Sequence, residues 1–218
     1  MITPDNRGIG RTKPQDIEIS IQQMTNDYIA LIKYLGLPSV NILGHSMGGF
    51  VALDCAIRYP ELISKLMLAG TSAFNSERNN ALYRQWVFHL ESGMELGAWF
   101  RNIFYWLFSK RILDDKEYLN DIIQIAVENP YRQCKIAFAN QVKAIEKFNC
   151  VEELPQIKTE TMVLYGKEDI LFPPEETIKV LQAIPNVRFS IIENAAHSIH
   201  IENPKEFTDC VLNFLRES

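Results

Sequence analysis

Cysteine is scarce and unpaired in this sequence. The four cysteines, Cys55, Cys134, Cys150 and Cys210, lie far apart among 218 residues and form no C-x-x-C motif. This spacing does not indicate a disulfide framework or a zinc site, and it is typical of reduced thiols in a cytoplasmic protein. We expect no metal, and no other pattern in the chain indicates a cofactor.

Positive charge is also limited. The chain has 22 Lys and Arg residues against 27 Asp and Glu residues, which gives a net charge of −5. The basic residues are scattered along the chain. Nucleic-acid binding needs a concentrated basic face that displaces counterions from phosphates, so nucleic acid is not an expected partner.

Long apolar runs are missing as well. No uncharged apolar run approaches the length that a bilayer requires, and the first residues, MITPDNRGIGR, contain no apolar core of a signal peptide. We therefore expect a cytoplasmic protein without stable membrane insertion. Its hydrophobic content of 47% is ordinary for a soluble globular domain with a sizeable core.

Strand and helix patterns alternate at both ends of the chain. Short apolar runs predict buried strands over 40–43, 63–69, 161–165 and 187–192. Amphipathic spacing and capping residues predict helices over 20–35, 48–58, 174–183 and 204–215. Ser20 with Gln23 forms a capping box, and Asn203 with Glu206 is typical of an N-cap. This alternation predicts an α/β fold with a mostly parallel sheet and flanking helices.

The middle of the chain breaks this alternation and is predicted to be mostly helical. One continuous apolar face there comprises Leu96, Trp99, Phe100, Ile103, Phe104, Leu107 and Phe108. We interpret it as a lid helix packed on the domain below; a membrane-surface helix, favoured by Arg101, Lys110 and Arg111, is the alternative. The predicted division is a core of residues 1–73 and 159–218 with a helical cap of residues 74–158.

A glycine-rich corner follows the first predicted strand. The residues Gly44-His45-Ser46-Met47-Gly48 match G-x-S-x-G between an apolar strand and a helix. A chain that turns from strand to helix at one residue strains that residue's backbone, and its neighbours must lack bulk. The Ser46 hydroxyl then stands at a helix N-terminus, where the Met47 amide and the helix dipole stabilise an oxyanion.

Other glycine-rich sites do not fit the sequence. No Lys-Ser/Thr pair follows Gly49, which excludes a P-loop. The dinucleotide fingerprint fails at Gly8-Ile9-Gly10, because Lys13 stands where the third glycine belongs.

A serine nucleophile needs a base and an orienting acid. Among four histidines, His197 follows the last predicted strand, and we favour it over His200 because the small residues before it leave room for an imidazole. His45 is expected to point away from Ser46 and to pack, and His89 lies in the helical middle. Asp169, which follows the strand 161–165, is the candidate acid.

Four segments resemble the α/β-hydrolase fold superfamily: GHSMGG, YGKEDILFPP, NAAHSIHIENP and TPDNRGIGRT. The resemblance covers nearly the whole chain, and residues 74–158 match that family's helical cap. It implies that Ser46 is the nucleophile, His197 the general base and then acid, Asp169 the orienting acid, and the Met47 amide one oxyanion donor. A serine at the corner argues against haloalkane dehalogenases and epoxide hydrolases, which use aspartate there.

The sequence departs from this family at its start. It contains no segment resembling the family's upstream strands or its His-Gly-type oxyanion loop, so the second oxyanion donor has no candidate. Losing one such donor lowers the rate by about 10²- to 10³-fold. The strand over 40–43 is then expected to have an unpaired edge through which the chain could form a homo-oligomer.

The expected function is a serine hydrolase of small to medium apolar esters that works through an acyl-enzyme. The aromatic residues Trp99, Phe100, Phe104, Phe108 and Phe138 are the candidates that line its apolar pocket. Two alternatives remain open at this point. One is an enol-lactone or carbon–carbon bond hydrolase with the same triad, and the other is a truncated, inactive remnant that needs a partner chain.

Overall fold

Four parallel strands form one sheet in the described part of the chain, in the order β1-β2-β3-β4. The structure, a computed structural model, describes residues 1–12 and 19–217. The strands are β1 (Val40–His45), β2 (Ile63–Ala69), β3 (Glu160–Gly166) and β4 (Val187–Ile192). All four predicted strands are therefore present, and two of them, β2 and β4, have the predicted bounds.

Helices before, between and after the strands cover the sheet. They are α1 (Ile21–Tyr34), α2 (Met47–Arg58), α8 (Pro174–Leu181), α9 (Ile199–Glu202) and α10 (Pro204–Arg216), with short 3-10 turns η1 (Pro60–Leu62) and η2 (Val151–Gln156). The predicted capping box at Ser20 is present. Asn203 is the residue before α10 as predicted, but its side chain does not cap the helix and instead donates to the Glu206 carboxylate at 2.7 Å.

Alternate residues of the central strands face two separate apolar layers. Leu66 and Leu68 pack with residues of α1, α2 and α8, whereas Met67 and Ala69 pack with α9 and α10. This period of two is expected where successive strand side chains point to opposite faces. The sheet is thus covered on both faces, as the parallel arrangement requires.

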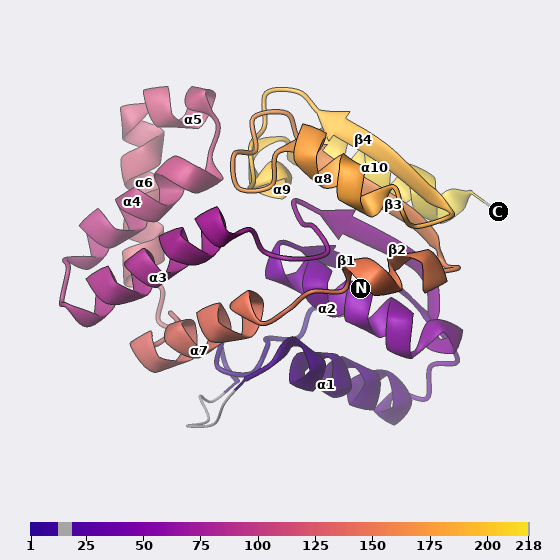
Figure 1. Cartoon of the computed structure of the whole chain (residues 1–218). Coiled ribbons are helices and arrows are strands. Elements are labelled where there is room, and N and C mark those ends of the chain that lie inside the picture. The colour runs from indigo at the N-terminus through magenta and orange to yellow at the C-terminus, as the bar shows by residue number, and fades with distance from the viewer. Residues whose placement is uncertain (13–18, 218) are drawn as a thin grey trace.

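A second group of helices lies between β2 and β3, and we call it the helical insertion. It comprises α3 (Glu77–Glu91), α4 (Leu96–Leu107), α5 (Lys110–Asp114), α6 (Lys116–Glu128) and α7 (Lys135–Glu146). The strand arrowheads in Figure 1 point toward the side on which this insertion lies. The loops that follow the strands therefore meet the insertion, at the end of a parallel sheet where ligands bind. The division at residues 73/74 and 158/159 stays a prediction.

One edge of the sheet is β1, which pairs only with β2 in the described residues. Its Leu43 side chain is 39% exposed. The unpaired edge that the sequence predicts is present there, and homo-oligomer formation through it stays a prediction. No helix in residues 1–12 and 19–217 is long and apolar enough to cross a membrane.

Candidate active site

Ser46 occupies the corner between β1 and α2. Its backbone has φ 54° and ψ −121°, a strained conformation for a residue other than glycine. The end of β2 and the residues after it hold Ser46 there, because the Ser46 amide donates to Ala69 O at 2.9 Å and Thr71 Oγ1 donates to Ser46 O at 2.9 Å. Met47 is the first residue of α2, so its amide lies at the positive end of the helix beside the serine.

The glycines around Ser46 are not equally necessary. A Cβ at Gly44 would lie 2.1 Å from Gly48 O, and one at Gly49 would lie 2.4 Å from Thr71 Cγ2. A Cβ at Gly48 would meet nothing within 4 Å. The expectation that the neighbours must lack bulk is therefore wrong for Gly48, which faces open space, and Gly49, outside the motif, is the second glycine that the packing requires.

Asp169 and His197 form a buried pair at the ends of β3 and β4. His197 Nδ1 and Asp169 Oδ2 are 3.0 Å apart, and Asp169 is 2% exposed. The other carboxylate oxygen, Oδ1, accepts from the backbone amides of Leu171 and Phe172, each at 2.9 Å. A carboxylate can only accept, so the shared proton belongs to His197 Nδ1, which leaves Nε2 free to take a proton.

The environment of Asp169 keeps its carboxyl group charged. Burial alone would raise its pKa, but attraction and hydrogen bonding by His197, together with the two backbone donors, outweigh burial and hold the pKa below its ordinary value. A charged carboxylate at this place stabilises a protonated imidazole next to it.

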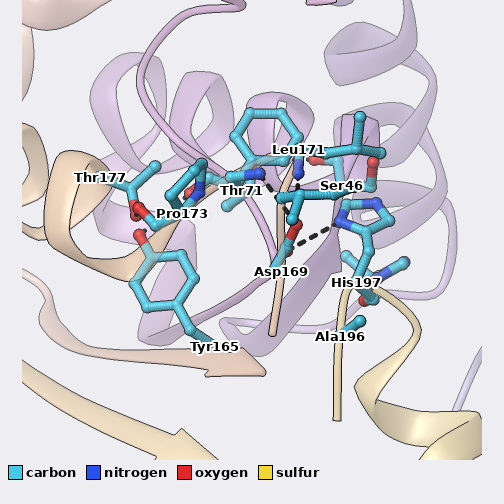
Figure 2. Close-up of polar contacts among 12 residues, drawn as sticks. Ser46, Thr71, Tyr165, Asp169, Leu171, Pro173, Thr177, Ala196 and His197 are labelled. Carbon is cyan, nitrogen blue, oxygen red and sulfur yellow. Dashed lines mark hydrogen bonds and ion pairs between the residues drawn. The ribbon is translucent and has the colours of Figure 1, made fainter. Parts of the chain in front are cut away.

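The three predicted triad residues meet in one place. Figure 2 shows the Ser46 side chain next to the His197 imidazole, away from the contact with Asp169. The residue after β2 packs closely against the Asp169–His197 pair: Gly70, at φ 52°, has no Cβ, and one placed there would lie 3.2 Å from His197 Nδ1 and 3.4 Å from Asp169 Oδ2.

The small residues before His197 lie in a tightly packed place. Ala195 and Ala196 are 0% and 1% exposed. They pack on the end of β3, where a Cβ on Gly166 would lie 2.1 Å from Ala196 O. Small residues are needed at both places because the two backbones approach closely, and this contact brings the His197 loop up to Asp169.

His45 has a role beyond the predicted packing. Its Nε2 donates to the backbone oxygen of His197 at 2.8 Å, which ties β1 to the loop that carries the candidate base. Burial, together with the neighbouring His197, lowers the pKa of His45 to about 3, so it is neutral near pH 7. His200 packs its ring 4.7 Å from that of His45. His197, not His200, is thus the histidine that meets the predicted acid.

A cavity of about 740 Å³ lies among the helices of the insertion, and Ile9 of the N-terminal segment also lines it. It is lined by four of the five predicted aromatic residues, Trp99, Phe100, Phe104 and Phe138. Phe108 does not line this cavity: it follows α4, which ends at Leu107, and its ring packs edge-on against Phe104 at 5.2 Å. That these five residues line a substrate pocket stays a prediction.

The cavity and the triad are separate but adjacent. None of the triad residues belongs to the cavity lining. They meet at Leu107, which lines the cavity and whose backbone oxygen accepts from the amide of Ser198, the residue after His197, at 3.0 Å. Within the described ranges, no group of three or more His, Cys, Asp or Glu side chains could hold a metal ion.

Known proteins resemble this chain over nearly its whole length. Residues 1–204 match the family model described as alpha/beta hydrolase fold. RutD of Rhizobium rhizogenes is 26% identical over 224 residues, which cover 99% of this chain and 82% of RutD. The 2-hydroxymuconate semialdehyde hydrolase of Pseudomonas putida is 27% identical over 238 residues, or 100% of this chain and 77% of that enzyme. A thermophilic esterase from Thermogutta terrifontis has a similar structure, with TM-score 0.84 at 25% identity, covering 98% of this chain and 78% of that one.

Proposed function

We propose that this chain, which belongs to the α/β-hydrolase fold family, is a serine hydrolase of small to medium apolar esters. The observation that supports this most is the arrangement of one imidazole between two partners: His197 is bonded to the buried Asp169 through Nδ1 and lies next to Ser46. A neutral imidazole so oriented can take the proton of the serine hydroxyl.

The reaction follows from these positions. Ser46 Oγ attacks the ester carbonyl while His197 Nε2 takes the hydroxyl proton, and the carbonyl oxygen becomes an oxyanion near the Met47 amide. The C–O bond to the alcohol breaks as His197 returns the proton to that alcohol, which leaves an acyl group on Ser46. Water then attacks the acyl-enzyme, with His197 again as base, and releases the carboxylic acid.

The cavity in the helical insertion supports an apolar acyl group as the substrate feature. Its lining combines apolar and aromatic side chains, such as Trp99 and Phe104, with a few polar ones, among them Arg132 and Gln133, and its volume suits a small to medium ligand. The resemblance to 2-hydroxymuconate semialdehyde hydrolase supports the second candidate, enol-lactone or carbon–carbon bond hydrolysis by the same triad.

Hydrolysis of p-nitrophenyl esters of increasing acyl length tests this proposal. We expect turnover with a maximum at an intermediate length, and a loss of about 10⁴-fold or more in Ser46→Ala. An enol-lactone and a vinylogous 1,5-diketone, tested in parallel, separate the second candidate. If the folded protein hydrolyses none of these compounds, the inactive remnant is the better account.

A further inference from the structure

Glu202 is a buried acid that the reaction above does not use. It is the last residue of α9 and is 8% exposed. Its Oε1 accepts from the Ala196 amide at 2.8 Å, and its Oε2 accepts from the Ser109 amide at 2.9 Å. Both oxygens face N–H donors, so the carboxylate joins two backbone segments that lie 87 positions apart in the sequence.

The two segments belong to different parts of the molecule. Ala196 directly precedes His197, whereas Ser109 stands between α4 and α5 of the helical insertion. Two more hydrogen bonds join the same parts: the Ser198 amide donates to Leu107 O at 3.0 Å, and the Arg111 guanidinium donates to Glu202 O at 2.8 Å. The His197 loop is thus bonded to the end of the helix that lines the cavity.

We propose that Glu202 is a positioning residue that places His197 and the cavity-lining helix α4 as one unit. The Glu202 carboxylate fixes the backbone before His197, and the His45 imidazole fixes the His197 carbonyl. Because the backbone is held on both sides of His197, its imidazole stays aligned between Asp169 and Ser46. This inference rests on the proposed function only for its kinetic part, because the alignment itself can be measured without a substrate.

Glu168 provides a matched control for Glu202. Its Oε2 also accepts a backbone amide of the insertion, that of Lys110, at 3.1 Å. Unlike Glu202, Glu168 is exposed, and the structure gives its carboxylate no bond to the His197 loop. The same change of carboxylate to amide removes a negative charge that faces the insertion at both positions. In Glu202→Gln an NH2 group must face one of the two backbone N–H donors, whereas in Glu168→Gln the remaining carbonyl oxygen can still accept from Lys110.

The experiment compares wild type, Glu202→Gln and Glu168→Gln. Steady-state hydrolysis of a p-nitrophenyl ester gives kcat and KM. A long-range ¹H–¹⁵N spectrum of the histidine rings at pH 8 gives the tautomer of His197, assigned with His197→Gln. We expect Glu202→Gln to lower kcat by about 10- to 100-fold with KM within about threefold, and to lose the Nδ1–H tautomer. Glu168→Gln should match wild type in its kinetic constants and in the His197 tautomer.

Several outcomes would overturn the proposal. Unchanged kcat and tautomer in folded Glu202→Gln would do so, even if thermal unfolding showed a loss of stability, because Glu202 would then be only structural. Equal effects of both variants would also contradict it. If wild type hydrolyses no ester but keeps the Nδ1–H tautomer that Glu202→Gln loses, the proposed function fails while the positioning role stands. Glu202→Ala, which lacks both acceptors, should show the same tautomer change if it folds.

Discussion

The loops after β3 and β4 and the helical insertion meet at the same end of the molecule, but different contacts hold them. In the loops, Asp169 accepts from His197 and from two backbone amides, and the His197 carbonyl accepts from His45. In the insertion, the cavity walls include aromatic rings in edge-on contact, such as Trp99 on Phe138 at 5.2 Å.

From this difference we expect the loops to determine the rate of the reaction and the cavity to determine which substrate is preferred. Hydrogen bonds between buried groups are directional, and a buried donor or acceptor left without a partner costs about 1–3 kcal/mol, so the loops tolerate little change. Ring contacts depend on shape and can be rearranged. Changes in the loops should therefore alter kcat, and changes in the cavity should alter the choice of substrate.

The largest expected effect separates the two histidines that follow β4, His197 and His200. His197→Gln should lower kcat for ester hydrolysis by about 10⁴-fold, because no base would take the Ser46 proton. His200→Gln is the control and should stay within a few fold of wild type, since His200 packs on His45 and Phe207. A loss of similar size in both variants would contradict the assignment of the base.

Alanine substitutions at Gly48 and Gly49 should change the free energy of unfolding in opposite directions. Gly49→Ala places a methyl group against Thr71 and should lower the free energy of unfolding by about 1–3 kcal/mol. Gly48→Ala adds a methyl group in open space within α2 and should raise it by about 0.5–1 kcal/mol. Urea denaturation measures both, and equal destabilisation would show that the motif glycine is also needed for packing.

The neutral His45 should make stability depend on pH. The folded protein binds a proton at His45 only near pH 3, whereas the unfolded chain binds one below about pH 6.5. Acidification from pH 7 to pH 5 therefore favours unfolding, by about 2 kcal/mol from this residue. Asp169 adds to this only at lower pH, because its folded pKa lies below the ordinary value of 3.8.

His45→Gln tests that pH dependence. Glutamine does not titrate and can still donate to the His197 carbonyl, so the free energy of unfolding should change by about 2 kcal/mol less between pH 7 and pH 5 than in wild type. Urea unfolding curves at the two pH values give this difference. Identical changes in the two proteins would mean that His45 titrates normally in the fold.

The smallest expected effect concerns the cavity. Phe104→Ala enlarges the lining and should shift the ratio of kcat/KM between long and short acyl esters by about tenfold toward the longer ones. Phe88→Ala, at a side chain that is 59% exposed on α3, should leave the ratio unchanged. A drop of kcat for all esters alike would indicate that Phe104 supports the triad and not the choice of substrate.

Features with a local pattern could be predicted from the sequence. The four strands follow from short apolar runs, and the corner at Ser46 follows from glycine spacing between a strand and a helix. Asp169 and His197 each follow a predicted strand, and parallel strands bring such positions to one end of a sheet. Three residues that are far apart in the chain could therefore be grouped before the structure was known.

Features that depend on one contact between distant segments could not be predicted. The bond from His45 to the His197 backbone and the two bonds of the Glu202 carboxylate leave no periodic or spacing pattern. Gly49 is required only because Thr71 lies against it. Phe108 shares the helical spacing of the cavity residues, but the helix ends one residue earlier, and helix ends are the least predictable part of a pattern.

Labelling by a fluorophosphonate tests the central claim, that Ser46 is an activated nucleophile, most directly. The folded protein should form one covalent adduct on the peptide that contains Ser46, as mass spectrometry can show. Ser46→Ala should form none, and His197→Gln should react far more slowly, because the base that activates the hydroxyl is missing. No adduct on the folded wild-type protein, or an equal rate in His197→Gln, would contradict the account.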